Sequence, residues 1–293
     1  MEVEIYSGQA CYVLQNTTLQ LLIPRDIGPR ILWFGFRDGE NLFADLPHFA
    51  ARLPDGGSYH FYGGHRLWAA PEHFSTTYAA DDSPVEVSAL PDGLMVTKPV
   101  EPQTGLQKSL EILLSGETQV VVKHHISNRN HHAVTCAPWA ITQFRTGGVA
   151  ILPQSRQNTG VLPNRSLALW SYTDISNPNV TWGNPCILVH AAMQSPFKIG
   201  FPNPRGWLAY WLDGTLFVKH ASLQPQAEYY DFNSSSECYC NDEFLELETL
   251  APITTLEPNQ SVSHVETWIL YRDIPSPKDE NDAQRIAQAL KLE

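Results

Sequence analysis

The sequence predicts an all-β protein, and three features of the 293-residue chain support this prediction. Short runs rich in branched and aromatic residues recur along almost the whole length. Pro, Gly, Asp and Asn separate these runs, as expected for antiparallel strands joined by tight turns. A helical spacing of apolar residues occurs only near the carboxyl end. Many antiparallel strands with few helices favour a sandwich or barrel over a parallel α/β sheet.

The predicted strands follow one another with turn residues between them. Asp213-Gly214 is the clearest two-residue turn, because Asp and Gly tolerate the positive φ that such hairpins require. No internal repeat or low-complexity linker divides the chain, so residues 1–275 are predicted to form a single domain. The strands are expected at residues 11–23 with a break at 16–18, then at 30–36, 86–90, 93–99, 106–114, 119–127, 133–144, 186–192, 198–201, 207–212, 215–220, 244–250 and 262–270.

Residues 276–293 are predicted to form an amphipathic helix. Ser276 is placed to cap it, Pro277 suits the first turn, and Asp279 adds a negative charge where the helix dipole favours one. We expect its apolar stripe to pack against the outside of the sheet. That stripe consists of Ala283, Ile286, Ala287 and Leu290.

Composition excludes several classes of protein. With 43% hydrophobic and 11% aromatic residues, the chain can bury a sizeable core and is not disordered. The formal net charge of -12, without a basic stripe, argues against a nucleic-acid or membrane partner. The amino-terminal residues show no secretory signal, and the five cysteines are odd in number and scattered. We therefore expect reduced thiols and a cytoplasmic location.

Residues 63–72, GGHRLWAAPE, are the first candidate functional segment. They place Arg66, Trp68 and Glu72 behind a Gly-Gly pair that is expected to be flexible. Charged groups bind sugar hydroxyls, and an aromatic ring packs on the C–H face of a sugar. The alternative is a tight turn followed by a core Trp and a surface ion pair.

Glu246 and Glu248 form the second candidate pair. Strand side chains alternate with period two, so both glutamates point to one side and Leu245 and Leu247 to the other. If the glutamates face a cleft, their pKa values split, giving one general base and one partner for an arginine. The alternative is a solvated strand face.

Histidine and cysteine patterns do not predict a metal site. The histidine pairs at 124–125 and 131–132 are adjacent residues, which face opposite ways in a strand. Cys238 and Cys240 lack a second ligand pair at suitable spacing, so we interpret them as incidental thiols.

Several segments, taken in order, resemble galactose mutarotase-like proteins, the group of aldose 1-epimerases and hexose-6-phosphate epimerases. The resemblance covers residues 3–272. It implies a β-supersandwich, a large twisted antiparallel sandwich with the sugar on its concave face, and chemistry without a metal or other cofactor. The segments are GPRI at 28–31 and NLF at 41–43, then 63–72, PWAITQF at 138–144 with Gly147-Gly148, and FLELETLAP at 244–252 with LEPNQ at 256–260.

The resemblance implies proton transfer at the anomeric carbon. In mutarotases a glutamate takes the proton of the C1 hydroxyl and a histidine protonates the ring oxygen, so that the ring opens and closes as the other anomer. Glu248 matches the family's glutamate and is the candidate base. Arg66 would then hold a sugar oxygen, and Trp68 would stack on the ring.

The family's histidine has no counterpart in residues 137–144, APWAITQF. His65 and His73 lie near the candidate segment and are the alternative acids. Asn41, Gln143, Glu72 and Glu246 are further candidate substrate-binding residues. A phosphorylated sugar would need a second cation, for which Arg30, Arg145 and Lys219 are candidates.

Three interpretations remain open at this point. The first is an anomer-interconverting isomerase with Glu248 as general base. The second is a non-catalytic carbohydrate-binding protein, and the third is a scaffold that no longer binds sugar. The expected partner in the first two is a monosaccharide or sugar phosphate.

Overall fold

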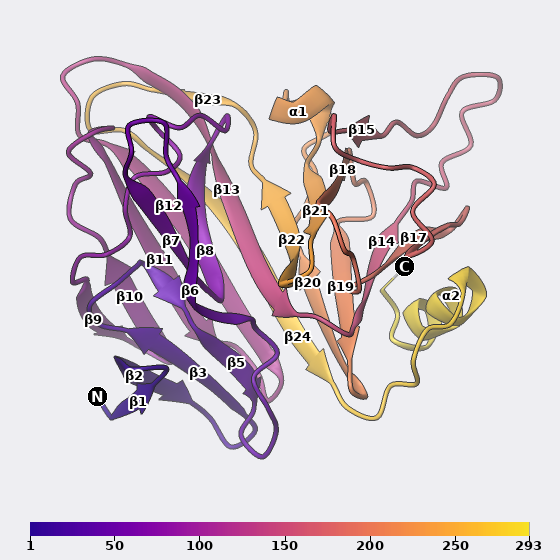
Figure 1. Cartoon of the computed structure of the whole chain (residues 1–293), viewed down its shortest axis with the longest axis horizontal. Coiled ribbons are helices and arrows are strands. Elements are labelled where there is room, and N and C mark those ends of the chain that lie inside the picture. Colours follow the sequence, from indigo (N-terminus) through magenta and orange to yellow (C-terminus); the bar gives the residue numbers. More distant parts are fainter. Residues whose placement is uncertain (293) are drawn as a thin grey trace.

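The computed structural model describes residues 1–292 and confirms the all-β prediction. Most strands belong to two large antiparallel sheets (Figure 1). Side chains from both sheets form one hydrophobic core. The ten-stranded sheet has the order β16 (Val180–Trp182), β17 (Cys186–His190), β14 (Val149–Pro153), β19 (Trp207–Leu212), β20 (Thr215–His220), β24 (Ser261–Tyr271), β12 (Gln119–Asn128), β11 (Leu106–Leu114), β10 (Gly93–Thr97) and β9 (Glu86–Leu90).

The eight-stranded sheet carries the cavity described below. Its order is β15 (Ala168–Leu169), β18 (Phe197–Phe201), β21 (Ser236–Cys240), β22 (Phe244–Leu250), β13 (Val134–Arg145), β8 (His65–Ala70) and β4 (Arg30–Ile31), with β23 (Thr254–Leu256) paired to β13. A four-stranded sheet and a separate hairpin complete the β structure. These are β1 (Val3–Tyr6), β2 (Gln9–Gln15), β3 (Leu19–Pro24) and β5 (Trp33–Phe36), and the hairpin of β6 (Asp45–Arg52) and β7 (Ser58–Gly63).

Every predicted strand has a counterpart, but several strands were not predicted. Most side chains of β6 are exposed, so the hairpin β6–β7 lacks a clear alternation of apolar and polar residues. Residues 65–70, expected beside a flexible turn, are instead the fully buried strand β8. The sequence therefore predicted the class of fold better than the position of each strand.

Gly63 and Gly64 lie where the chain packs tightly against the backbone of other segments, and they do not form a flexible turn. Both have positive φ, 87° and 72°. A Cβ on Gly63 would lie 2.0 Å from the carbonyl oxygen of Ala44, and one on Gly64 would lie 2.1 Å from that of Ile31. Only glycine allows this approach, which fixes where β8 enters the sheet.

Helix α2 (Glu280–Ala289) packs against the outer face of the ten-stranded sheet, as predicted. It begins later than expected, because Asp279 and not Ser276 is its N-cap. The backbone N–H groups of Asn281 and Asp282 both donate to Asp279 Oδ1 at 2.9 Å. The other helical segment, α1 (Tyr230–Asn233), is a single turn. Within residues 1–292, neither helix has the length and apolarity needed to cross a membrane.

A buried polar network lies between the two large sheets. His65 Nε2 and His124 Nε2 are 2.7 Å apart, His124 Nδ1 lies 3.0 Å from the carbonyl oxygen of His264, and Lys219 pairs with Glu266 at 2.8 Å. Potential ligand atoms of His65, His124 and Glu266 lie within 4.8 Å of one another, a convergence that the sequence did not predict. Burial lowers the pKa of His124 to about 4 and that of His264 to about 3.

These depressed pKa values predict that acid destabilises the fold. The unfolded state binds protons at His124 from its ordinary value of 6.5 downward, while the folded state resists protonation until about 4. The free energy of unfolding is therefore highest above pH 6.5 and decreases as the pH is lowered. His124 alone lowers it by about 2 kcal/mol at pH 5. Urea unfolding of wild type and His124→Gln between pH 7 and 5 measures this. An equal decline in both proteins would contradict it.

Gly64→Ala is predicted to lower the free energy of unfolding by at least about 2 kcal/mol, because its Cβ would collide with backbone. Gly147→Ala is the matched control, since Gly147 also has positive φ but no heavy atom within 4 Å of where its Cβ would stand. Chemical denaturation compares the two variants. If both lose the same amount, backbone strain and not the close approach explains the effect.

Candidate functional site

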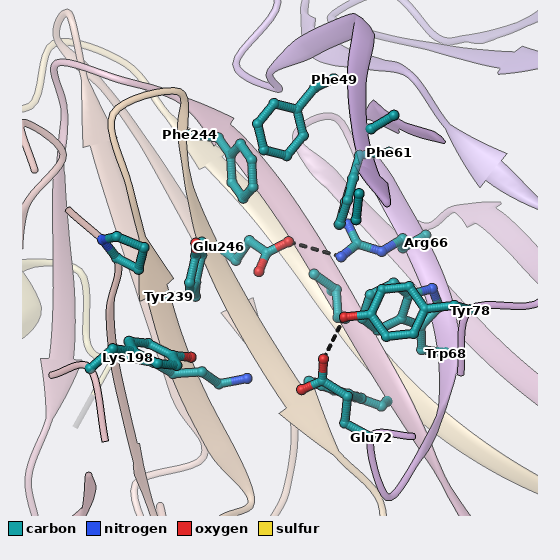
Figure 2. Close-up of a pocket in the computed structure, with 16 residues that line it drawn as sticks. Phe49, Phe61, Arg66, Trp68, Glu72, Tyr78, Lys198, Tyr239, Phe244 and Glu246 are labelled. Carbon is teal, nitrogen blue, oxygen red and sulfur yellow. Dashed lines mark hydrogen bonds and ion pairs between the residues drawn. The ribbon is translucent and has the colours of Figure 1, made fainter. Parts of the chain in front are cut away.

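The eight-stranded sheet, the hairpin β6–β7 and neighbouring loops line an open cavity of about 410 Å³ (Figure 2). Half of its lining residues are aromatic, and charged side chains converge between the rings. The lining residues are Phe49, Ala50, Ala51, Phe61, Arg66, Trp68, Glu72, Tyr78, Trp139, Ile141, Tyr172, Pro196, Lys198, Tyr239, Phe244 and Glu246. A cavity of this size and composition suits a small ligand with both apolar faces and polar groups.

Strand register explains why these side chains meet. Ile141 of β13 lies opposite Arg66 of β8 on one side and Glu248 of β22 on the other, and Glu248 lies opposite Glu237 of β21. Period-two alternation adds Glu246 to the same face of β22, as predicted. Leu245 and Leu247, on the other face, belong to the main hydrophobic core, which confirms that part of the prediction.

Arg66 is held against the wall of the cavity. Its Nη2 donates to Glu246 Oε1 at 2.9 Å, and its guanidinium lies 4.3 Å from the centre of the Trp68 ring. Nε and Nη1 of Arg66 are buried, and neither has a hydrogen-bond partner among the described residues. Because a buried donor without a partner is costly, Arg66 keeps unsatisfied hydrogen-bonding capacity beside the cavity.

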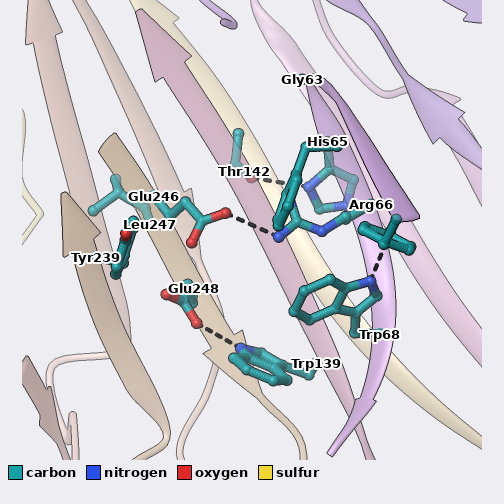
Figure 3. A network of polar contacts seen from close by, with 12 residues as sticks. Gly63, His65, Arg66, Trp68, Trp139, Thr142, Tyr239, Glu246, Leu247 and Glu248 are labelled. Carbon is teal, nitrogen blue, oxygen red and sulfur yellow. Dashed lines mark hydrogen bonds and ion pairs between the residues drawn. The ribbon is translucent and has the colours of Figure 1, made fainter. Parts of the chain in front are cut away.

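Lys198 links the buried carboxylates on the opposite side of the cavity. Its Nζ lies 2.8 Å from Glu237 Oε2 and 3.0 Å from Glu248 Oε2. Glu248 Oε2 also accepts a hydrogen bond from Trp139 Nε1 at 2.7 Å (Figure 3). The second oxygen, Oε1, is buried and has no partner within residues 1–292. Glu248 therefore offers one anchored oxygen and one unused acceptor.

Burial and neighbouring charges set different proton affinities around the cavity. Burial raises the pKa of Glu246 to about 7; Glu248 adds to this rise and Arg66 opposes it. Burial also raises the pKa of Glu237 well above its usual range. For Lys198, burial alone lowers the pKa, but Glu237 and Glu248 outweigh it and raise the pKa well above its ordinary value. The site therefore mixes a firmly protonated amine with carboxylates of unequal basicity.

Comparison with known proteins gives a fold but no sequence family. No protein-family profile matches the chain, and no curated protein matches it. Among solved structures, a galactose mutarotase-like protein from Lactobacillus casei has a TM-score of 0.55 at 12% identity, covering 89% of this chain and 100% of that one. A galactose mutarotase related enzyme from Lactobacillus acidophilus has a TM-score of 0.53 at 9% identity, covering 92% of this chain and 99% of that one. The chain has the galactose mutarotase-like fold.

The same fold is found inside a longer protein. A TPR-domain containing protein from Parabacteroides distasonis has a TM-score of 0.64 at 14% identity, covering 92% of this chain and 48% of that one. At this level of identity the likeness establishes the fold alone. The resemblance read from the sequence motifs is confirmed to that extent.

On this galactose mutarotase-like scaffold, four of the predicted binding residues line the cavity: Arg66, Trp68, Glu72 and Glu246. Glu72 is at the exposed rim, where its Oε1 accepts a hydrogen bond from the hydroxyl of Tyr78 at 2.5 Å. Glu248 is fully buried and bonded to the lining residues Trp139 and Lys198. The sequence missed Lys198, although a lysine between the apolar residues of β18 was a signal of a buried cation.

Other predicted binding residues lie outside the lining. Arg30 is buried, and its Nη1 donates to the carbonyl oxygens of Phe61 and Gly63 at 2.7 Å, so it anchors strand β7. Asn41 bonds the backbone of β5 and its flanking residues. Gln143 is buried opposite Glu246, and neither of its amide side-chain atoms has a partner among the described residues.

The alternative cations for a phosphate group also lie elsewhere. Arg145 pairs with Glu40 on the surface at 2.8 Å. Lys219 lies on the core side of the sheet, where it pairs with Glu266. Neither is among the residues that line the cavity.

The two histidines predicted as acids, His65 and His73, do not line the cavity. His65 points to the opposite face of β8 from Arg66, because neighbouring strand residues alternate, and its Nδ1 lies 2.9 Å from Thr142 Oγ1 in the core. His73 lies on an exposed loop and bonds Ser75 at 2.8 Å. Among the described residues, the cavity lining contains no histidine.

Lys198→Met is predicted to lower the free energy of unfolding by about 3–5 kcal/mol at pH 7, because it leaves Glu237 and Glu248 buried without their cation. The loss should shrink as pH falls, since burial raises the pKa of Glu237 and this carboxyl group then takes up a proton. Lys123→Met, which breaks a partly exposed pair with Glu111, is the control and should cost less than about 1 kcal/mol. Equal losses in urea unfolding would contradict the assignment.

Proposed function

We propose that the chain binds a monosaccharide in this cavity and interconverts its anomers by ring opening, with Glu248 as general base. The observation that carries the proposal is the unused, buried Oε1 of Glu248 beneath an aromatic-walled cavity that also holds Arg66. The galactose mutarotase-like fold supports it. So does the match of Glu248 to the glutamate of the mutarotase motif.

The ligand fits the cavity in two ways. Trp68 offers an aromatic ring for the C–H face of a sugar, while the unpartnered donors of Arg66 offer hydrogen bonds to its oxygens. Glu248 Oε1 would accept the proton of the C1 hydroxyl, because the other oxygen is already held by Trp139 and Lys198.

The charges favour an unphosphorylated sugar. Both cations of the cavity are already paired, Arg66 with Glu246 and Lys198 with Glu237 and Glu248. A phosphate dianion would therefore meet carboxylates whose charge is not fully offset. A cytoplasmic location is part of the proposal, and the five free, buried cysteines agree with a reducing environment.

A non-catalytic sugar-binding protein is the second candidate function. The absence of histidine among the described lining residues favours it, because the acid of the family's reaction is then missing.

The test is NMR exchange spectroscopy of the protein with glucose, galactose and glucose 6-phosphate. We expect faster exchange between the α and β anomers of a free hexose than in a protein-free control. Glu248→Gln should reduce the rate at least about 100-fold while changing sugar affinity by no more than about 3-fold. Saturation transfer to the sugar without faster exchange would support binding alone, and the absence of both would contradict the proposal.

Arg66→Ala is predicted to weaken sugar affinity by roughly 10- to 100-fold, because a charged hydrogen-bond donor is lost from a buried site. Isothermal titration calorimetry measures the effect. Arg285→Ala, on the exposed face of α2, is the matched control and should leave affinity unchanged. Unchanged affinity in Arg66→Ala would place the sugar elsewhere.

A further inference from the structure

Ring opening needs an acid at the ring oxygen, and the described lining residues offer few proton donors. Lys198 is bound by two carboxylates that hold its proton firmly. The hydroxyl of Tyr78 is already donated to Glu72, and burial raises the pKa of Tyr239 to about 12. A group that loses its proton so reluctantly is a poor acid near neutral pH.

Glu246 differs from these groups in position and in proton affinity. Its Oε1 accepts a hydrogen bond from Arg66, so a proton on this carboxyl group must reside on Oε2. Figure 2 shows this second oxygen turned toward the middle of the cavity. Burial raises the pKa of Glu246 to about 7, so near neutral pH part of the population is protonated.

Glu246 and Glu248 form a pair with unlike environments on one strand face. Their Cα atoms are two residues apart, about 7 Å along the strand, so the two carboxyl groups can approach the C1 hydroxyl and the ring oxygen, which are both bonded to C1, from different sides. Lys198 and Trp139 both bond Glu248 Oε2, at 3.0 Å and 2.7 Å. Glu246 has the charge of Glu248 nearby, which opposes the ionisation of Glu246. Two carboxyl groups with such different surroundings suit opposite roles in proton transfer.

We propose that Glu246, with its proton on Oε2, is the acid that protonates the ring oxygen in place of the missing histidine. This inference rests on the proposed function. Glu248 removes the proton of the C1 hydroxyl, and the electron pair of that O–H bond forms the C1 carbonyl. The bond from C1 to the ring oxygen breaks, and Glu246 transfers the proton on Oε2 to the ring oxygen. After rotation about C1–C2 both transfers reverse on the other face of the carbonyl, so both glutamates regain their starting states.

The test compares anomer exchange rates of wild type and Glu246→Gln by NMR between pH 5.5 and 8.5. Gln keeps an oxygen for Arg66 but carries no transferable proton. We expect the variant to lose at least about 100-fold in rate. The wild-type rate should fall as pH rises through about 7, and the residual rate of Glu246→Gln should lack this decline. Glu111→Gln, on the partly exposed surface of β11, is the matched control.

The outcomes separate this inference from the function on which it rests. Exchange in Glu246→Gln within about 3-fold of wild type, or with the same alkaline decline, overturns the role of Glu246 and leaves the proposed function standing. Wild type that fails to accelerate exchange at any pH overturns both. A ¹³C-carboxyl titration of the glutamates provides a check independent of folding of the variant. A Glu246 resonance that titrates near 7 supports the role, and one that titrates near 4 overturns it.

Discussion

The ion pairs of Lys198 with Glu237 and Glu248 are the interaction on which the floor of the cavity depends. A carboxylate removed from water is unstable unless a cation and hydrogen bonds compensate it. Lys198 supplies the charge, and Trp139 supplies a hydrogen bond to the same oxygen of Glu248. These groups bind Oε2, whereas Oε1 of Glu248 is buried and has no hydrogen-bond partner among residues 1–292.

Strand β22 connects these ion pairs to the hydrophobic core. One face of the strand carries Glu246, which lines the cavity, and the buried Glu248, which is bonded to the lining residues Trp139 and Lys198. Leu245 and Leu247, on the other face, pack in the main hydrophobic core. A shift of register by one residue would exchange the two sets, so the packing that stabilises the fold also fixes the orientation of the carboxylates. The close backbone approach at Gly63 and Gly64 likewise fixes the position of β8 and so the position of Arg66.

Alternation and turn residues were sufficient to predict the all-β class, most strands and the common face of Glu246 and Glu248. They could not predict contacts between distant segments, such as that of Lys198 with Glu248, 50 residues apart. The place of His65 could not be predicted because residues 65–70 were expected beside a turn. They form a regular strand, in which His65 and Arg66 face opposite ways. Arg30 and Asn41 lie in matching motifs, but their hydrogen bonds hold backbone and not the cavity.

The proposed chemistry requires that the two β22 glutamates face one sugar ring. A crystal structure of the protein with a neutral hexose bound at neutral pH tests this requirement most directly. We predict a pyranose in the cavity, with one hydroxyl at hydrogen-bond distance from Glu248 Oε1 and the ring oxygen close to Glu246 Oε2. A sugar bound outside the cavity, or bound within it but away from both carboxyl groups, would contradict this arrangement.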